Sequence, residues 1–515
     1  MMELSSVSFS FKLLVTAIVT ISLAKFVSIL HRQLTHWRNR RVPYIWSMPV
    51  FGTGWRVFSR LMSFPDYAQF IYHYYPNVKY VGIMDFATPT VVVRDPELIK
   101  EISVKSFEHF PDHLGFVSEE VDPIFGRNIF SLRGDRWRVM RNTLSPSFTT
   151  SKMKFMFSLV SKCSKEFVGY LYDHPEFSSS METKDAFTRY TNDVIATAAF
   201  GISVNSLEDR ENEFFTRGTD ATKFGGLGRL LKFMLFRFSP YLSRLMGLSF
   251  LSPDSASFFY RIVSETVKTR DEENIVRPDM IHLLMQARDK EKSSTHRMTI
   301  EDIIAQVFIF FLAGFDTSST LMCYLVHELT VNQDIQEKLR EEVERYMAEG
   351  NGDISYEALS KMEYMEMVTS ETLRKYPPVV FIDRLCAEKF ELPSAGPGYD
   401  GVIVRPTDVV WFPVYAIHHD PNYFPDPEKF DPERFSGKNI DSIQPYTYMP
   451  FGFGPRKCIG NRFALMETKI LIAHLLHRFR LHPTEKTKHP VTFSKAHFSL
   501  LSDDGFWVGL EKRNV

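Results

Sequence analysis

The chain has 515 residues, which is enough for one unusually large domain or for two or three ordinary ones. Its composition is that of a globular protein, with 44% hydrophobic and 24% charged residues. The formal net charge of -1 gives no general attraction to nucleic acid or to acidic ligands, so we expect no nucleic-acid partner.

A membrane anchor is predicted over residues 1–30. The stretch from Leu13 to Leu30 carries one charge, Lys25, and as a helix it is about long enough to cross a bilayer if Lys25 reaches the lipid–water boundary. A cleaved signal peptide is the alternative, although no small-x-small cleavage site precedes the basic run that follows. That run predicts that the rest of the chain is cytoplasmic, and it comprises Arg32, Arg38, Arg40 and Arg41.

A linker is predicted over residues 31–55, because Pro43 and Pro49 stiffen this segment and suit a spacer between a membrane and a folded body. The remainder, residues 56–515, is predicted to be one domain. No long Gly- or Ser-rich segment divides it, and no repeat occurs at solenoid periods.

This domain is expected to be mostly α with a smaller β part. Residues 78–94 resemble two strands around a Thr-Pro turn, and helical periodicity dominates from residue 96 to about residue 380. Strand-like and proline-rich sequence follows from residue 390 to residue 435. A helical run from Arg462 to Phe479 and a strand-like C-terminus complete the chain.

Cys458 is the most informative of the four cysteines, which lie too far apart for a CxxC metal site and are expected to be reduced. It lies in PFGFGPRKCIGNRFA, residues 450–464, after Arg456 and Lys457 and just before a predicted helix. Both the cations and a helix N-terminus favour a thiolate. A structural cysteine would have apolar neighbours and a nucleophile would need a nearby histidine. A single thiolate ligand to haem iron remains.

The helix predicted over residues 303–325 is apolar almost all round and then places several small and polar residues in its middle. Glycine there costs about 1 kcal/mol against alanine, and a buried aspartate costs more unless it has partners. The purely structural interpretation is a helix bend in which the Thr317 hydroxyl donates a hydrogen bond to the preceding turn. The functional interpretation is a reactive site at Gly314, Asp316 and Thr317.

These motifs resemble those of the cytochrome P-450 superfamily. Phe451-x-x-Gly454-x-Arg456-x-Cys458-x-Gly460 is similar to its haem-binding signature, with Lys457 where many relatives carry asparagine. Ala313-Gly314-x-Asp316-Thr317 is similar to its oxygen-activation motif. The resemblance implies that Cys458 ligates the iron of haem b, that Ala313 and Gly314 leave room for O2, that Thr317 holds the reduced-oxygen intermediate and that Asp316 helps to deliver protons.

The resemblance also implies how the cofactor and the fold are held. A buried haem carries two carboxylates, and the residues expected to bind them are Trp137, Arg141, Arg384 and Arg456. Glu371 and Arg374 of SETLRKYPP are expected to form a structural triad with Arg434, because Asp431 to Phe435 matches the segment that supplies the third member.

The sequence of residues 80–100 and 136–157 is similar to the insect group known as family nine, which is related to the vertebrate family-three drug oxidisers. The implied function is an NADPH- and O2-dependent monooxygenase of the endoplasmic reticulum membrane, acting on lipophilic molecules such as plant toxins or insecticides. No dinucleotide-binding fingerprint is present, so NADPH-cytochrome P-450 reductase must supply electrons, and cytochrome b5 is a possible second partner. The predicted docking face consists of Arg136, Arg138, Lys457 and Arg462.

The substrate pocket is the least specified part. Residues 223–251 resemble a region that roofs the pocket and dips into lipid, although two core-facing helices fit equally. Matching to the family gives pocket residues Phe116, Phe125, Phe224, Phe308, Phe311 and Val380. Two other functions are weighed: a haem-thiolate enzyme that rearranges peroxides without reductase, and a membrane-tethered haem sensor without chemistry. The intact Asp316 and Thr317 argue against the first.

Overall fold

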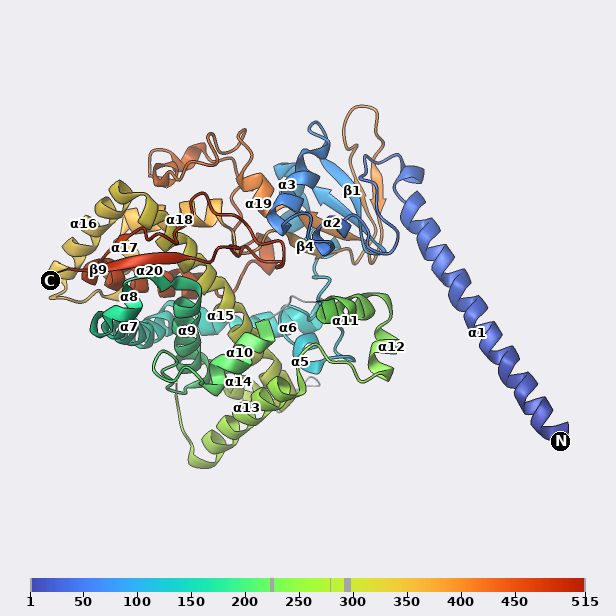
Figure 1. Cartoon of the computed structure of the whole chain (residues 1–515), viewed down its shortest axis with the longest axis horizontal. Coiled ribbons are helices and arrows are strands. Elements are labelled where there is room, and N and C mark those ends of the chain that lie inside the picture. Colours follow the sequence, from blue (N-terminus) through green and yellow to red (C-terminus); the bar gives the residue numbers. More distant parts are fainter. Residues whose placement is uncertain (1, 223–226, 278, 291–297, 514–515) are drawn as a thin grey trace.

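Figure 1 shows the computed structural model, which describes residues 2–222, 227–277, 279–290 and 298–513. Helices dominate, and the largest sheet lies at the end of the body nearest to α1 (Figure 1). The predicted fold class, mostly α with a smaller β part, is confirmed. The longer helices are α1 (Met2–Thr35), α3 (Phe64–Tyr74), α6 (Gly134–Leu144), α7 (Thr150–Asp173), α9 (Thr183–Ile195), α10 (Glu213–Thr222), α11 (Leu227–Phe238), α13 (Pro253–Glu273), α14 (Met280–Lys290), α15 (Ile300–Val331), α16 (Gln333–Glu349), α18 (Glu363–Lys375) and α20 (Asn461–Arg478).

Short helices and nine strands connect these elements in the described part of the chain. The short helices are α2 (Trp55–Phe58), α4 (Pro96–Lys100), α5 (Pro123–Gly126), α8 (Pro175–Ser178), α12 (Pro240–Leu245), α17 (Tyr356–Lys361) and α19 (Val414–His418). The strands are β1 (Tyr80–Asp85), β2 (Thr88–Val93), β3 (Met181–Glu182), β4 (Ile382–Leu385), β5 (Phe390–Leu392), β6 (Val402–Val404), β7 (Val409–Phe412), β8 (Phe479–His482) and β9 (Trp507–Lys512).

The largest sheet has the strand order β1-β2-β7-β4, in which β2 and β7 run parallel and the other neighbours run antiparallel. The predicted Thr-Pro turn is wrong, because Thr88 and Pro89 already belong to β2 and the chain turns at residues 86–87. Phe86 adopts the left-handed conformation there, with φ of 52°. Pro89 is tolerated because β7 pairs only with residues 90–92 of β2, so the missing N–H is not required.

The predicted linker, residues 31–55, lies against the body. Trp37, Val42 and Ile45 are buried, and Tyr44 forms a bridge with Gly82 of β1. The predicted linker therefore forms part of the folded body.

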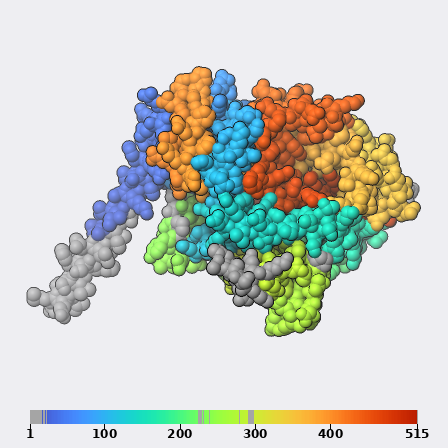
Figure 2. Space-filling model, turned by 180° about the vertical axis from the view of Figure 1, so that it is seen from behind, coloured from blue at the N-terminus to red at the C-terminus, as the bar shows by residue number. Residues whose placement is uncertain are grey.

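Figure 2 shows residues around 390–410 (orange) beside the N-terminal part of the body (blue). This agrees with the hydrogen bond from the Lys79 N–H to the Ala395 carbonyl at 2.7 Å.

The long helix α15 crosses the helical part of the body (Figure 1). It starts with a capping box, in which the Asp302 N–H donates to the Thr299 hydroxyl and the Thr299 N–H donates to the Asp302 carboxylate. Within the described residues α15 is the helix long and apolar enough to cross a membrane, but 67% of its most apolar window is buried, as in a core helix. The N-terminal span stays a prediction.

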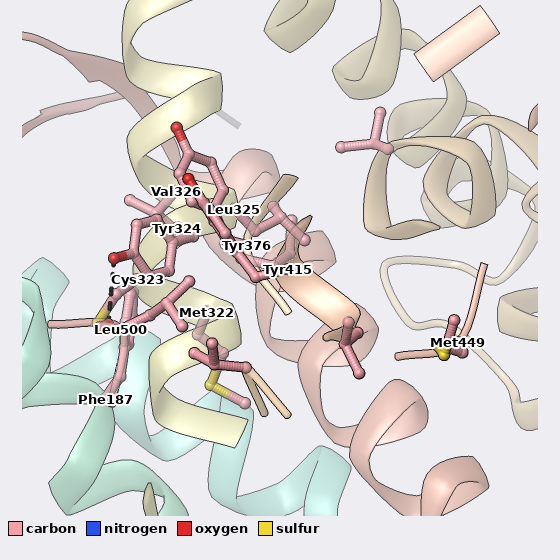
Figure 3. Close-up of a cluster of buried hydrophobic side chains, with 14 of the residues drawn as sticks. Phe187, Met322, Cys323, Tyr324, Leu325, Val326, Tyr376, Tyr415, Met449 and Leu500 are labelled. Carbon is pink, nitrogen blue, oxygen red and sulfur yellow. Dashed lines mark hydrogen bonds between the residues drawn. The ribbon is translucent and has the colours of Figure 1, made fainter. Parts of the chain in front are cut away.

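The second half of α15 anchors the core. Figure 3 shows Tyr324 beside Tyr376, the residue that follows α18, and the two rings stack with centroids 4.0 Å apart. The Tyr324 hydroxyl donates to the Leu500 carbonyl at 3.1 Å, and Met322 and Cys323 are fully buried. The helix is therefore buried on all sides from Ser318 to Thr330, and its accessible positions within the body lie before Ser318.

Candidate functional site

Cys458 lies on a tight loop that enters α20 three residues later. Its N–H donates to the Phe451 carbonyl at 2.9 Å, and the Lys457 N–H donates to the Gly454 carbonyl at 3.0 Å. Gly454 has φ of +70°, and a Cβ there would lie 2.0 Å from the Ser103 carbonyl oxygen. Only glycine fits this position.

Gly460 serves a different purpose. Its φ of -91° is open to any residue, and a Cβ there would meet nothing within 4 Å. Glycine is therefore not required by the backbone or by packing. Its missing side chain leaves space next to Cys458, as the close approach of a flat ligand requires.

The Cys458 side chain is accessible, yet burial among protein atoms is the largest influence on its acidity. This combination is expected for a side chain that faces an internal hollow. Burial raises the pKa of the Cys458 thiol, while the N–H groups of Gly460 and Asn461 and the charges of Arg141 and Lys457 oppose the rise. The cations and the helix N-terminus therefore act in the predicted direction, but burial outweighs them, and a bound metal ion would favour loss of the proton.

The middle of α15 presents an accessible stripe within the body. Ala313 and Thr317, one turn apart, are exposed, although the neighbouring Phe311, Phe315 and Ser318 are buried. Ile459, the residue after Cys458, packs against the same apolar cluster as Phe311 and Phe315. From these exposures we infer that the accessible stripe and the cysteine loop border one hollow.

The Thr317 hydroxyl donates to the Ala313 carbonyl at 2.5 Å. This is the hydrogen bond to the preceding turn that the purely structural interpretation of the motif predicts. It also places the Thr317 oxygen on the accessible side of the helix, so the bond and a role in chemistry are compatible.

Gly314 has a packing reason to be glycine, and its role in leaving room for O2 stays a prediction. A Cβ at this position would lie 2.5 Å from the terminal methyl group of Ile195 on α9. The glycine is therefore explained by the close approach of α9, and the accessible residue next to it is Ala313.

Asp316 is held by Lys184, a residue of α9 that the sequence analysis did not single out. The Lys184 ammonium donates to the Asp316 carboxylate at 2.8 Å, to the Asp316 carbonyl at 3.2 Å, to the Ser319 hydroxyl at 2.8 Å and to the Thr320 hydroxyl at 2.9 Å. The Lys184 side chain is 19% exposed, so this polar contact connects α15 with the protein surface. Lys184 is 132 residues away along the chain, and no sequence pattern links it to Asp316.

Arg384 is the clearest sign of a missing anion. Its side chain is 1% exposed, its two terminal nitrogens donate to the carbonyls of Asp383 and Phe453, and its Nε–H has no partner within the described chain. No carboxylate of the described residues lies within ion-pair distance. Burial lowers the pKa of Arg384 to about 10. A buried guanidinium of this kind fits a haem carboxylate.

Arg456, in contrast to Arg384, has most of its N–H groups engaged by other residues of the protein. It pairs with the Asp112 carboxylate at 2.9 Å, donates to the carbonyls of Pro111, Ile129 and Leu132, and stacks on Trp137 with 4.0 Å between the guanidinium carbon and the ring centre. It therefore ties residues 111–132 to the cysteine loop. Its predicted contact with a haem carboxylate would use at most its remaining Nη1–H.

Trp137 and Arg141 lie on one face of α6, as predicted. The Trp137 indole N–H makes no hydrogen bond within the described residues and is free for an anion. Arg141 donates to the Lys457 carbonyl at 2.9 Å and so reaches the cysteine loop. An accessible cysteine, a hollow and free buried donors together fit a flat cofactor that carries iron and two carboxylates.

The predicted structural triad is present. Both side chains of Glu371 and Arg374 are fully buried and form a bidentate pair at 2.8 and 2.9 Å. The Arg434 guanidinium lies 3.4 Å from the Glu371 carboxylate. The same carboxylate also accepts a hydrogen bond from the Asp431 N–H at 2.9 Å. The triad fixes the segment after α19 against α18.

Most predicted pocket residues belong to the core. Phe125, Phe308, Phe311 and Val380 are at most 2% exposed, and the three phenylalanines pack within a cluster that includes Phe259. Phe116 is 39% exposed, and Phe224 lies outside the described residues. Away from its two ends, the partly accessible large apolar residues of α15 are Ile309, Phe310 and Leu312. Counting back one helical turn from Ala313, which the sequence analysis had already named, would have found Ile309.

The predicted basic docking face is partly neutralised. Lys457 is exposed and has no side-chain partner in the described chain. The other three cations have partners: Glu119 for Arg136, Glu108 for Arg138, and the Phe148 carbonyl, the Thr150 hydroxyl and the Tyr356 hydroxyl for Arg462.

Comparisons with known proteins agree with this geometry. Residues 43–507 match the family model described as Cytochrome P450. The chain is 46% identical over 502 residues to cytochrome P450 9e2 of Blattella germanica, covering 92% of this chain and 93% of the relative. It is 42% identical over 493 residues to probable cytochrome P450 9f2 of Drosophila melanogaster, covering 93% and 95%. It is also 36% identical to cytochrome P450 6j1 of Blattella germanica, covering 97% and 99%.

Proposed function

The chain belongs to the cytochrome P450 family, and on this premise we propose that it inserts one oxygen atom into lipophilic small molecules such as plant toxins or insecticides. Members of this family are haem-thiolate monooxygenases, so the chain carries haem b and uses O2 and electrons from NADPH. The bound haem supplies O2 activation and the oxidising oxygen atom. The chain supplies the axial sulfur, the site for the substrate and the protons.

The observation that carries the assignment of residues is the exposure of Cys458 and of Ala313 and Thr317 on α15, from which the hollow between the cysteine loop and α15 is inferred. In this proposal Cys458 is the iron ligand, with Phe451 and Gly460 shaping its loop. Arg384, Trp137 and Arg141 bind the haem carboxylates, and Arg456 mainly holds the loop in place. Ala313 leaves the accessible side of α15 open, with Gly314 allowing α9 to approach.

Protons are proposed to move along the polar contact between α9 and α15. Lys184 orients the Asp316 carboxylate, and Asp316 passes a proton toward the accessible side of the helix. The Thr317 hydroxyl, bonded to Ala313, lies on that side and directs the proton to the reacting oxygen.

The lining of the hollow supports a preference for uncharged, apolar substrates. Between Ile303 and Phe315 the accessible residues of α15 are Ile309, Phe310, Leu312, Ala313 and Gly314, none of which carries a charge. A charged molecule would lose its hydration there without a partner.

Electrons are proposed to come from a separate NADPH-dependent flavoprotein reductase, with cytochrome b5 as a second donor. Exposed Lys457 lies next to Cys458, and Arg136 and Arg138 can exchange their glutamate partners for acidic groups of a reductase. We propose that residues 1–30, which include most of α1, anchor the chain in the endoplasmic reticulum membrane with the catalytic domain in the cytoplasm. Exposed apolar side chains of α11 and α12, among them Leu231, Tyr241 and Leu245, would touch the same bilayer.

The test is a reconstitution of the full chain in membranes with and without the reductase. We expect product only with reductase, NADPH and O2, and a carbon monoxide spectrum of the thiolate type for the wild type and for Cys163→Ser, but not for Cys458→Ser. Product formed without the reductase would contradict the proposal. So would a substrate-induced spin-state shift with charged polar compounds and with no lipophile.

A further inference from the structure

A cavity of about 220 Å³ lies where α1 meets the body, between residues 33–38 and residues 44–47. It is separate from the hollow at Cys458 and plays no part in the proposed chemistry. Its walls come from the end of α1 and from the segment predicted as a linker. The cavity therefore belongs to the junction between the proposed anchor and the folded body.

The walls of this cavity are fixed by buried hydrogen bonds. The Gln33 amide donates to the carbonyls of Met48 and Phe86 at 2.9 and 3.1 Å and accepts from the Val50 N–H at 3.1 Å. The Trp37 indole donates to the Ile83 carbonyl at 2.7 Å, and its ring covers Gly82, where even a Cβ would come within 2.5 Å. The cavity is thus formed before any ligand binds.

Its free polar groups are suited to an anion with several oxygens. Within the described chain, the Arg38 guanidinium, the Tyr44 hydroxyl and the Trp46 indole N–H have no hydrogen-bond or ion-pair partner, and all three residues line the cavity. No aspartate or glutamate lines it. The surroundings are also positive: burial first, and then the charges of Arg40, Arg32 and Arg405, lower the pKa of the adjacent His36 to about 3.

The position along α1 points to the source of such an anion. The apolar stretch of the sequence ends at Leu30, and the large side chains of Ile21, Leu23, Phe26 and Val27 are exposed. At about 1.5 Å per helical residue, residues 33–38 lie roughly 5–12 Å beyond the hydrocarbon edge. Headgroups occupy about 5–7 Å on each side of the hydrocarbon core. Trp46, 56% exposed, is typical of side chains at this depth.

We propose that this cavity binds the phosphate headgroup of a membrane glycerophospholipid, with Arg38 pairing with the phosphodiester and Tyr44 and Trp46 donating hydrogen bonds to it. The inference rests on the proposed membrane insertion of α1. The bound lipid would fix the height and tilt of the body above the bilayer, because Gln33 and Trp37 join the same helix end to β1.

The test uses the full chain purified in mild detergent with added phosphatidylcholine and phosphatidylglycerol, and counts retained lipid by native mass spectrometry. We expect one retained phospholipid, with Arg38→Gln weakening binding about tenfold, the effect of losing one charge-assisted hydrogen bond. Arg41→Gln is the matched control, since Arg41 does not line the cavity and makes only an exposed 3.9 Å contact with Asp400. It should change retention less than twofold.

Equal retention by the wild type and Arg38→Gln would overturn the proposal. Inorganic phosphate alone, occupying the site with the same Arg38 dependence and displacing lipid, would also overturn the choice of a lipid. Alkaline carbonate extraction of membranes separates the two hypotheses. A chain that washes off the membrane contradicts the anchor itself, whereas a chain that stays but retains no lipid contradicts only the headgroup site.

Discussion

The ammonium group of Lys184 lies 2.8 Å from the carboxylate of Asp316 and also donates to the Ser319 and Thr320 hydroxyls one turn further along α15. The pair joins α9 to the middle of the helix whose accessible residues face the cysteine loop. It gives the aspartate a fixed position and a partner at the protein surface. This relationship leads to the first prediction.

Lys184→Met should lower the ratio of product to NADPH consumed by roughly tenfold, because Asp316 loses the charge-assisted hydrogen bond that orients it. The electrons from NADPH that do not lead to product should form hydrogen peroxide. Product, NADPH and peroxide are measured together in the reconstituted membrane system. Lys184→Arg should restore most of the coupling, and Lys162→Met, at an exposed i,i+4 pair on α7, is the control. Wild-type coupling in Lys184→Met would contradict a role for this pair.

Thr317→Ala should likewise divert electrons to peroxide, since the hydroxyl on the accessible side of α15 is lost. Thr330→Ala is a matched control, because Thr330 donates the same kind of bond, to the Val326 carbonyl at 2.7 Å, at a buried position of the same helix. Each variant loses about 1 kcal/mol of stability from the missing hydrogen bond. Only Thr317→Ala should uncouple the reaction, and equal coupling in both variants would assign Thr317 a structural role alone.

Arg384→Leu should reduce haem retention by roughly ten- to a hundredfold, because a buried charge-assisted contact with a carboxylate is removed. The haem-to-protein ratio is measured after dilution of the purified enzyme. The haem-free chain should not be destabilised, since its guanidinium is buried with a free Nε–H. Arg480→Leu, at an exposed position, serves as control. Full retention of haem in Arg384→Leu would remove Arg384 from the set of haem contacts.

Glu371→Gln should destabilise the protein by about 3–5 kcal/mol, because Arg374 and Arg434 would be left buried without their common carboxylate. Denaturant unfolding followed by haem absorbance measures the loss. Glu363→Gln, at an exposed position of the same helix, should change stability by less than about 0.5 kcal/mol. A similar small effect for both variants would show that the triad is not needed for stability.

Asp193 of α9 makes the pH dependence of stability testable. Burial raises its pKa from the ordinary 3.8 to about 6, although Ser206 and Asn192 donate hydrogen bonds to it. Between pH 4 and pH 6 the folded state therefore keeps a proton that the unfolded state releases. Stability relative to Asp193→Asn should fall by about 3 kcal/mol as pH rises across this range. Parallel pH profiles for the two proteins would contradict the raised pKa.

Local chemistry in the sequence was enough to predict the cysteine loop, the central helix and the triad, because each depends on residues close together in the chain or on a strong motif. The helical run before Phe479 was placed within one residue of α20. Contacts made only by tertiary packing could not be predicted. Ile195 against Gly314 and Lys184 against Asp316 both arise where α9 meets α15, and the sequence gives no register for that contact.

Other errors had a signal that was available. Phe308 and Phe311 were chosen as pocket residues for their type, although their position on the helix relative to Thr317 places them on the buried side. The Thr-Pro pair was interpreted as a turn because proline seldom occurs inside a central strand. The partial pairing of β2 with β7 explains why it is allowed.

The clamp formed by Gln33 and Trp37 shows where a water-soluble version of this enzyme should begin. Deleting the residues up to 32 removes the apolar N-terminal segment. Both clamp residues, Gln33 and Trp37, then keep their hydrogen bonds to β1 and to the turn that follows it. A chain that starts after residue 40 would instead lack Gln33 and Trp37. It would lose the indole that covers Gly82 and the side chains that donate to the carbonyls of Ile83 and Phe86. The shorter fragment, though it contains every residue proposed to touch haem, should express as aggregate.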